Sequence, residues 1–387
     1  MKKLMSGIFA FGFTLLCASS FGASVYSAAG DFSHTTNPNG VWKYGYKSGS
    51  TFTLITNVSK VHSNPDVWFW QGLPGLNFGE PTLGKNEGTN NWVINGTTTY
   101  HPGDFAMHPG PNGEKATLRW TSPAAGSYQV VASFKGADAS TSTDVHIEVG
   151  GTEVFSAIVT GNSTAQSYTF YTQAPSGTNI DFLVGPNGSY SFDTTTTTVT
   201  ITPTTCWDVA GDFSHTANPN NQWKYGYKAF GSDTFVLIDS GTAGQVNSDP
   251  DVWFWQGGAG YIGEPTAGKN EGNTAWVIAG TTTYEPGDFA LHPGPNGERA
   301  VARWTCPTTG NYHIYASFTA GDPSNTSDAS IKKGSTTLLA VGAIPQTYDN
   351  TIALTAGDTI DFSAGWGSNN DYLYDTTITS INICRAP

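Results

Sequence analysis

The sequence has few charged side chains, and only a minority of those are basic. Asp, Glu, Lys and Arg make up 12% of the 387 residues, and 17 basic side chains stand against 30 acidic ones. Nucleic-acid-binding domains carry a basic face, so this class is excluded. A disordered acidic chain has few aromatic residues, but here they reach 13%. Helical bundles are rich in Ala, Glu, Lys and Leu, whereas Thr, Ser, Asn and Gly dominate here and favour short strands and turns.

A long hydrophobic run occurs only near the N-terminus. Lys2 and Lys3 precede an apolar stretch that ends at Cys17, and small residues follow. This order predicts a signal peptide over residues 1–22, because the stretch is too short for a transmembrane helix. We therefore expect a secreted, extracellular bacterial protein, exported by the Sec route, with no membrane span.

Cysteine is scarce as well. Cys206, Cys306 and Cys384 remain after removal of the signal peptide, and an odd number in an oxidising compartment leaves one thiol unpaired. The first and last strands of a β-sandwich often pair, so we expect a Cys206–Cys384 disulfide with Cys306 free. Three unpaired thiols are the alternative.

The common catalytic motifs are missing from the sequence. It contains no G-x-S-x-G, H-E-x-x-H or C-x-x-C, and the Lys of a Gly-Lys pair is followed by Asn86, which does not fit a Walker A loop. No two His residues lie at zinc-ligand spacing. We therefore expect a protein without catalysis. Glu80 and Glu114 could act as an acid–base pair on a polysaccharide, but nothing in the sequence fixes their separation.

The remaining sequence contains two similar copies. GDFSHTTNPNGVWKYGYK at 30–47 recurs as GDFSHTANPNNQWKYGYK at 211–228. The first copy covers 28–203 and the second covers 209–384, and this period is far longer than the roughly 20–50 residues of solenoid or propeller repeats. We expect two tandem homologous globular domains.

Within each copy the patterns indicate strands and turns. Residues 115–120 alternate between apolar and polar side chains, and residues 128–134 and 312–318 are aromatic and β-branched and follow Pro-x-x-Gly turns. Short strands separated by frequent turn signals are typical of β-sandwiches. The expected fold class is all-β, with two tandem β-sandwich domains of jelly-roll type.

The aromatic segment Asp66–Gly72 is the first candidate ligand site. In a strand, Trp68 and Trp70 share one face and could present two indole rings to a sugar. A central strand that is buried on both faces is the alternative, because it also gives a continuous apolar run. The exposure of the two rings decides between these interpretations.

Polar residues near two turns extend the candidate site. A hairpin over His108–Glu114 would bring His108, Glu114 and Arg119 into a cluster able to bind a sugar hydroxyl or carboxylate, unless the segment serves only turn geometry and an exposed ion pair. Asn86 lies in a Gly-bounded loop that fits either ligand binding or solvated surface. The expected ligand-binding residues are Trp68, Trp70, Asn86, Trp92, His108, Glu114 and Arg119, with Trp253, Trp255, Asn270, Trp276, His292, Glu298 and Arg303 in the second copy.

Aspartates at matching positions of the two copies suggest a structural calcium site. Hard oxygen ligands on extracellular loops suit Ca²⁺, although the sequence has no EF-hand spacing. The expected metal ligands are Asp138, Asp144, Asp193, Asp322, Asp328 and Asp375. No other cofactor is expected.

The second half of each copy resembles carbohydrate-binding modules of the jelly-roll kind, with families six and thirty-five the most similar. The resemblance is carried by Trp304-Thr305-Cys306-Pro307, Gly310-Asn311-Tyr312, Ala316–Phe318, Ala356–Phe362 and Tyr374-Asp375, and the first copy repeats these features. It implies a jelly-roll sandwich that binds a glycan, with or without Ca²⁺. It carries over no catalytic residue, and the ligand-stacking aromatics of those families lie on variable loops.

The composition, the duplication and the resemblance together predict a function. We expect a secreted, non-catalytic carbohydrate-binding protein with two similar glycan-binding modules for a polysaccharide. An extracellular matrix or surface-assembly protein, whose copies associate with each other through strand edges, is one alternative. A polysaccharide-cleaving enzyme is the other.

Overall fold

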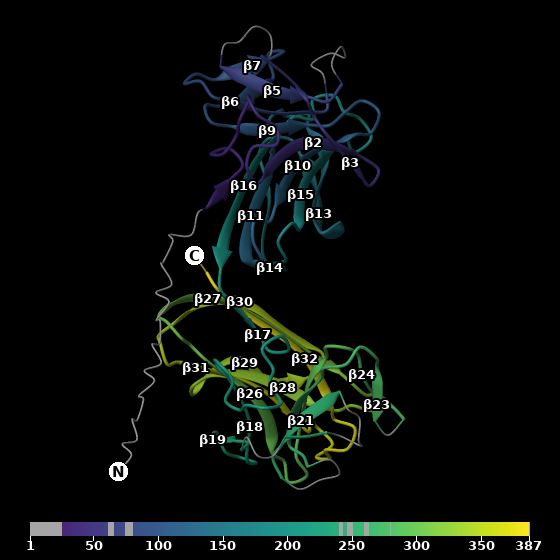
Figure 1. Ribbon diagram of the computed structural model, residues 1–387, viewed down its shortest axis with the longest axis vertical. Coiled ribbons are helices and arrows are strands. Elements are labelled where there is room, and N and C mark those ends of the chain that lie inside the picture. Colours follow the sequence, from purple (N-terminus) through teal and green to yellow (C-terminus); the bar gives the residue numbers. More distant parts are fainter. Residues whose placement is uncertain are drawn as a thin grey trace, which may run out of the picture. The chain divides into compact units, whose positions relative to one another are not determined.

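The computed structural model describes residues 25–60, 66–73, 80–239, 243–245, 251–258, 263–278 and 280–386. The predicted signal peptide, residues 1–22, lies outside the described residues. The described chain is built from strands and turns and forms two sandwiches, each with its own pair of large sheets (Figure 1). Within those residue ranges, no helix is long and apolar enough to cross a membrane.

The first sandwich contains strands β1 to β16. They are β1 (Tyr26–Ser27), β2 (Trp42–Ser48), β3 (Thr51–Leu54), β4 (Asn57–Lys60), β5 (Val67–Gln71), β6 (Thr82–Asn86), β7 (Trp92–Ile94), β8 (Thr98–Tyr100), β9 (Phe105–His108), β10 (Lys115–Thr121), β11 (Gly126–Gly136), β12 (Ser142–Val149), β13 (Thr152–Thr160), β14 (Gln166–Ala174), β15 (Asn179–Gly185) and β16 (Thr195–Thr204). The larger sheet has the order β14-β11-β16-β9-β6-β5-β4, with β1 beside β16, and the smaller has the order β13-β12-β15-β10-β2-β3. Strands β7 and β8 form a separate hairpin.

The second sandwich contains strands β17 to β32. They are β17 (Cys206–Asp208), β18 (Trp223–Lys228), β19 (Phe235–Leu237), β20 (Ala243–Gln245), β21 (Val252–Gln256), β22 (Thr266–Asn270), β23 (Trp276–Ile278), β24 (Thr282–Tyr284), β25 (Phe289–His292), β26 (Arg299–Thr305), β27 (Gly310–Ala320), β28 (Asp328–Lys333), β29 (Thr336–Ala343), β30 (Gln346–Leu354), β31 (Thr359–Gly365) and β32 (Thr377–Arg385). Its sheets run β20-β21-β22-β25-β32-β27-β30, with β17 beside β32, and β19-β18-β26-β31-β28-β29. The strand order repeats that of the first sandwich, so the predicted all-β tandem fold is confirmed.

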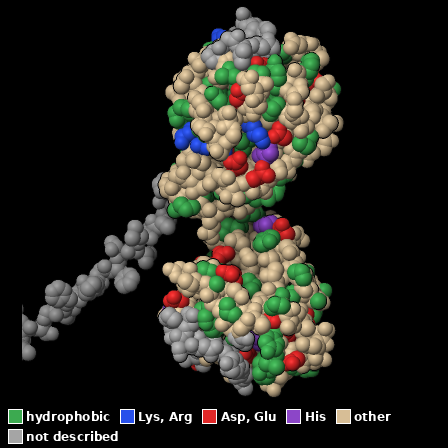
Figure 2. All heavy atoms as spheres, turned by 90° about the vertical axis from the view of Figure 1, so that its right-hand side faces the viewer, with side chains coloured by type: hydrophobic (Ala, Val, Ile, Leu, Met, Phe, Trp, Pro, Cys, Tyr) green, Lys and Arg blue, Asp and Glu red, His purple; other side chains and the backbone are tan. Residues whose placement is uncertain are grey.

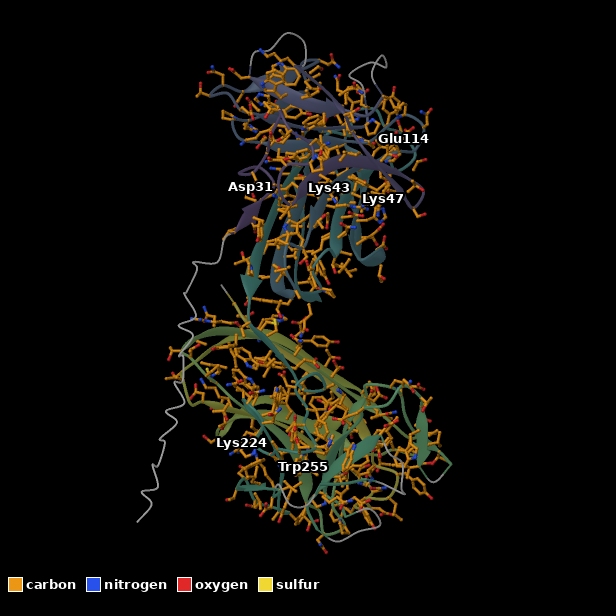
Figure 3. All side chains as sticks on the ribbon, in the orientation of Figure 1. Asp31, Lys43, Lys47, Glu114, Lys224 and Trp255 are labelled. Atoms are coloured by element: carbon orange, nitrogen blue, oxygen red, sulfur yellow. A yellow bond between two sulfur atoms is a disulfide. The ribbon has the colours of Figure 1, made fainter. Side chains whose placement is uncertain are left out.

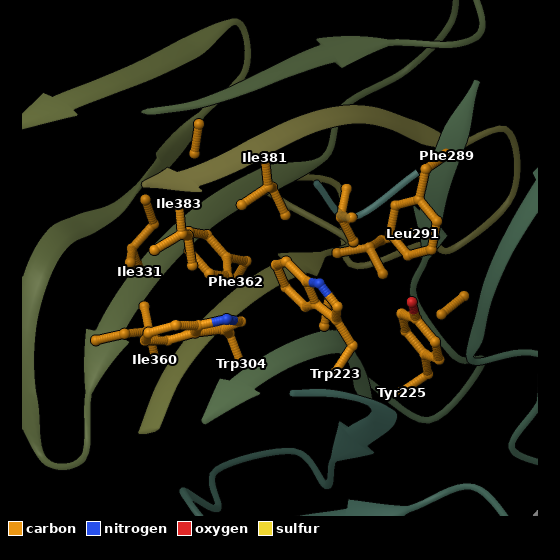
Figure 4. Packing of buried hydrophobic residues seen from close by; sticks show 14 of the residues in the cluster. Trp223, Tyr225, Phe289, Leu291, Trp304, Ile331, Ile360, Phe362, Ile381 and Ile383 are labelled. Carbon is orange, nitrogen blue, oxygen red and sulfur yellow. The ribbon is translucent and has the colours of Figure 1, made fainter. Parts of the chain in front are cut away.

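The main core of each sandwich lies between its two sheets. In the second, Trp223 of β18 pairs with Trp304 of β26, and both indole rings are fully buried beside Phe362 and Ile381 (Figure 4). Side chains alternate across each strand, so every second residue enters this core while its neighbours face outward. The alternation seen in the sequence is therefore the pattern of a sheet with one face on the core.

Strand β5 departs from this pattern because both of its faces are covered. Trp70 faces the main core, while Val67 and Phe69 join a smaller cluster with Tyr100 on the outer face, covered by the β7–β8 hairpin. The ring of Phe69 lies across β6 at Gly84, where an added Cβ would lie 2.0 Å from the ring. The sequence alternative of a strand buried on both faces is therefore the correct one.

A disulfide joins Cys206 and Cys384, as the sequence predicts, and Cys306 is a buried free thiol. The two bonded residues face each other across the β17–β32 ladder. The bond connects the first strand of the second sandwich to its last.

Candidate functional site

Trp70 and Trp255 are core residues, so the prediction that they stack on a ligand is wrong. Their side chains are 3% and 0% exposed. Each indole Nε1 donates to a backbone carbonyl, Ser33 O at 2.8 Å and Ser214 O at 3.0 Å. Figure 3 shows Trp255 inside the second sandwich.

Trp68 is partly exposed, but its ring already has a stacking partner. The imidazole of His34 lies parallel to the indole, with the ring centroids 4.2 Å apart, and its Nδ1 is 2.9 Å from a carboxylate oxygen of Glu87. The ammonium of Lys60 lies 4.9 Å from the indole centroid. The second copy repeats the stack with Trp253, His215 and Glu271. These tryptophans therefore hold a loop to the larger sheet, and the prediction of an open stacking platform is wrong.

Trp92 and Trp276 are partly buried in the two hairpins. The ring of Trp92 packs 5.5 Å from that of Tyr100, and Trp276 packs 5.8 Å from Tyr284. Their packing fixes the position of the hairpin over the larger sheet. Both rings thus have a structural role, and their ligand role stays a prediction.

Asn86 is buried, and its amide is fully used by the protein. Its Nδ2 donates to the carbonyls of Asn90 and Tyr100 at 2.9 and 3.1 Å, and its Oδ1 accepts from the N–H of Gly88 at 3.0 Å. Asn270 makes the same three bonds in the second copy. Both N–H donors are used and the residue is 1% exposed in each copy, so the predicted sugar contact is wrong.

The expected cluster of His108, Glu114 and Arg119 does not form. The Glu114 carboxylate accepts from the backbone and side-chain nitrogens of Asn112 at 2.9 and 3.0 Å, which closes the turn. Arg119 donates to both carboxylate oxygens of Asp181, at 2.6 and 2.8 Å. Glu298 and Arg303 repeat these contacts. The turn and ion-pair alternative holds for Glu114 and Arg119 in both copies.

The aspartates expected to bind calcium each have protein partners. Asp138, Asp193, Asp322 and Asp375 accept backbone N–H groups at 2.7–2.9 Å, while Asp144 pairs with Lys115 and Asp328 pairs with Arg299. In the part of the chain that the structure describes, no group of three or more His, Cys, Asp or Glu side chains is placed to hold a metal ion. The structure does not bring the predicted ligands together, and calcium binding stays a prediction.

A pocket of about 170 Å³ lies on the outer face of the larger sheet in the first sandwich. Its floor comes from β5, β6 and β9, and its walls come from the β7–β8 hairpin and the loop before β16. It is lined by Phe69, Glu80, Thr82, Ile94, Asn95, Thr98, Tyr100, His108, Tyr190, Ser191, Phe192 and Thr194. Four aromatic rings and several polar side chains thus converge in one small cavity.

Glu80 is the unusual group in this pocket. The residue is 4% exposed, its Oε2 has no hydrogen-bond partner among the residues that the structure describes, and burial raises the pKa of its carboxyl. A buried polar atom without a partner costs about 1–3 kcal/mol, which a ligand hydroxyl would relieve by donating to it. An unpaired carboxylate oxygen at the wall of a pocket is therefore a ready acceptor.

His108 supplies a second acceptor. Burial lowers its pKa to about 4, so the imidazole is neutral at pH 7. Its Nδ1 lies 2.8 Å from the carbonyl of Pro109, which places the proton on Nδ1 and leaves Nε2 as an acceptor. The ring of Tyr190 meets the imidazole edge-on at 6.2 Å.

The rim of the pocket carries backbone strain. Phe192 has a φ of +65° and is 49% exposed, and Asn95 has a φ of +51°. A bulky residue in the left-handed region costs on the order of 1–3 kcal/mol and is typical of functional sites. Tyr374, the counterpart of Phe192, has a φ of +66°. Both copies therefore hold an exposed aromatic ring in a strained loop at the same point.

Sequence reasoning named only part of this pocket. His108 was expected to bind a ligand and does line the cavity, whereas Glu80 was considered only as a catalytic acid. Tyr190 and Phe192 were missed. The available signal was an aromatic-x-aromatic-Asp pattern in a Gly- and Asn-rich loop, which both copies contain before their last strand.

No protein-family model matches the sequence, and neither does any curated protein. Solved structures similar to the chain include xanthan lyase from Paenibacillus, which is 12% identical with a TM-score of 0.27; the match covers 77% of this chain and 25% of that enzyme. Tandem CBM51 modules of a family 98 glycoside hydrolase from Streptococcus pneumoniae are 10% identical over 77% of this chain and 88% of that one, with a TM-score of 0.22. A family 35 carbohydrate-binding module from Clostridium thermocellum is 12% identical over 35% of this chain and 89% of that one, with a TM-score of 0.19.

Proposed function

We propose that the protein is a secreted glycan-binding protein without catalysis, and that the pocket around Glu80 holds one sugar residue. The observation that carries the proposal is the unpaired Oε2 of Glu80, buried in the wall of a pocket lined by aromatic rings. Such a group is costly for the empty protein and is compensated when a donor enters. Sugar hydroxyls are donors of this kind.

The lining of the pocket matches both surfaces of a sugar ring. A pyranose has apolar C–H faces and a rim of hydroxyl groups. Aromatic rings such as Tyr100, Tyr190 and Phe192 suit the faces, while Glu80 and the Nε2 of His108 suit the hydroxyl hydrogens.

The size of the pocket favours a single ring. An apolar cavity of about 150 Å³ holds benzene, whereas sites for larger ligands measure about 300–1,000 Å³. A volume of about 170 Å³ therefore suits one six-membered ring, such as the terminal or a side-chain residue of a polysaccharide.

The second sandwich repeats the buried glutamate, the neutral histidine and the tyrosine of this site. Glu264 is 3% exposed, burial lowers the pKa of His292 to about 4, and the ring of Tyr372 meets His292 edge-on at 6.1 Å. Leu373 replaces Ser191 at the rim. Two sites on one chain raise the avidity for a repetitive polysaccharide through effective concentration, without any new contact.

The test is binding by paired isosteric variants. A glycan array identifies the sugar, and calorimetry then compares the full chain with a Glu80→Gln/Glu264→Gln variant. We expect binding to weaken about 10–100-fold, because the hydrogen bonds of a charged acceptor are lost. The matched control is Glu114→Gln/Glu298→Gln, which removes turn carboxylates of the same type and should leave the affinity unchanged.

Unchanged affinity in the Glu80→Gln/Glu264→Gln variant would place the binding site elsewhere. Release of reducing ends from the bound polysaccharide, lost in the same variant, would establish the cleaving enzyme instead. Secretion is tested separately by N-terminal sequencing of the exported protein. The first residue found should lie shortly after Gly22.

A further inference from the structure

The second sandwich has a pocket that contains an aromatic pair with no counterpart in the first. The cavity, of about 370 Å³, lies among the β18–β19 turn, the start of β26 and the β31–β32 loop. Phe230 is 71% exposed, and its ring lies 6.1 Å from the ring of Trp366 at an angle of 55°. Trp366 is partly buried, and an exposed phenyl ring packed on it beside a cavity is typical of a contact surface.

The two rings lie against a turn that is open in the first copy. A Cβ added at Gly297, where φ is +84°, would lie 2.6 Å from the Phe230 ring and 2.7 Å from the Trp366 ring. Gly113, at the same point of the first copy, has nothing within 4 Å of its Cβ position. The two rings therefore cover the turn at Gly297, whereas the matching turn at Gly113 is uncovered.

The sequence difference between the copies is local. Ala229-Phe230 stands where the first copy has Ser48, and Trp366 stands where it has Pro186. The first sandwich forms the same sheets without either ring. The pair is therefore not required for folding, and a role in contact with a ligand explains it better.

Polar groups suited to hydroxyls line the same pocket. Arg299 forms an ion pair with Asp328 through Nη1, but its Nη2 is buried and has no hydrogen-bond partner within the described part of the chain. Asp233 is paired with Lys332 at 2.5 Å, while 69% of its side chain remains exposed. Each charged side chain of the lining has a partner of opposite charge, so the pocket offers a donor at Arg299 and an acceptor at Asp233 without an unpaired ion.

We propose that this pocket is a second sugar-binding site for a neutral pyranose, which stacks on Phe230 and Trp366. Its hydroxyls accept from Arg299 Nη2 and donate to Asp233. The inference extends the proposed glycan binding but stands on different residues. It makes the two sandwiches unequal, because only the second would carry two sites.

The experiment titrates the full chain with methyl β-glucoside and methyl β-galactoside at millimolar concentrations, following calorimetry and tryptophan fluorescence. Phe230→Ala removes a highly exposed side chain and should not disturb folding, and Trp366→Pro introduces the residue that the first copy has. We expect each variant to weaken sugar binding at this pocket about tenfold or more. The control variant, Ser48→Ala, alters the matching point of the first copy and should change nothing.

The Glu80→Gln/Glu264→Gln variant separates this inference from the proposed function. Sugar binding that survives in that variant and disappears on adding Phe230→Ala supports the second site. Binding that is unaffected by Phe230→Ala and Trp366→Pro overturns the inference, even if the Glu80 pocket is correct. Binding of methyl glucuronide alone, or of none of the sugars, overturns it as well.

Discussion

Replacing Arg119 tests whether the charged residues on the smaller sheet hold the fold or bind a ligand. Its guanidinium on β10 donates to both oxygens of Asp181 on β15 and lies 3.9 Å over the ring of Phe52. Asp181 is 2% exposed, and the ammonium of Lys47 lies 2.6 Å from its Oδ2, which also accepts from Arg119. Figure 3 places Lys47 on this sheet, and Figure 2 shows charged side chains gathered on the visible face of the first sandwich.

The expected effect follows from the burial of Asp181. Arg119→Met keeps an apolar stem over Phe52 but leaves the carboxylate with Lys47 alone. Removing one partner of a buried ion pair costs about 3–5 kcal/mol. Lys47, which is shared with Glu148, remains beside the carboxylate, and the Arg119 side chain is 17% exposed, so we expect the lower end, about 3 kcal/mol. In a domain of this size that lowers Tm by about 6–12 °C.

The assay is urea unfolding followed by tryptophan fluorescence, with sugar binding measured in parallel. Arg303→Met is the matched variant, because Arg303 holds Asp361 at 2.6 and 2.8 Å in the second sandwich. Each variant should shift the transition of its own sandwich, and Arg119→Met/Asp181→Leu should recover most of the loss. An unchanged midpoint combined with lost sugar binding would refute the reasoning and restore the ligand role of Arg119.

Three further predictions concern stability. Cys206→Ser should lower the free energy of unfolding by about 5 kcal/mol, because the disulfide closes a loop with a sequence separation of 178; an unchanged urea midpoint would contradict this. A hydrogen bond to Asp144 raises the pKa of His146. Protonated His146 therefore stabilises the folded protein fully below about pH 6.5, and this stabilisation is lost as the pH rises through the folded-state pKa. The Tm difference between the wild type and His146→Gln should therefore shrink from about pH 6 to about pH 9. Trp70→Ala should lower the free energy of unfolding by about 3–5 kcal/mol and Trp68→Ala by clearly less, because only Trp70 is fully in the core. Urea unfolding of the two variants measures the difference.

The all-β class, the duplication and the disulfide could be predicted because their signals are local or repeated in the chain. Alternation marks strands, recurrence marks copies, and the positions of Cys206 and Cys384 mark the ends of one domain. The orientation of Trp68 and Trp70 could not be predicted in the same way. Alternation places them on one face, but only the docking of sheet on sheet decides whether that face is the core. That contact joins residues far apart in the sequence.

The pocket was beyond sequence reasoning for the same reason. Glu80 comes from the segment before β6, while Tyr190 and Phe192 come from a loop before the last strand of the sandwich. No short motif contains both. The motif from His108 to Glu114 contains one residue of the pocket lining, His108. Its Glu114 does not face the pocket but accepts hydrogen bonds from Asn112 and closes the turn.

Recurrence between the copies explains why most predicted site residues turned out to be structural. Residues such as Asn86 and Arg119 recur in the second copy with the same partners at nearly the same distances, because both sandwiches need the same loop fixed and the same carboxylate neutralised. Conspicuous residues that recur in both copies are therefore mostly residues that stabilise the fold. The copies differ at single positions beside the two pockets, Ser191 against Leu373 and Pro186 against Trp366, whereas Glu80, His108 and Tyr190 recur. Recurrence alone therefore does not separate pocket residues from those that stabilise the fold, and that distinction needs the cavity and the hydrogen-bond partners seen in the structure.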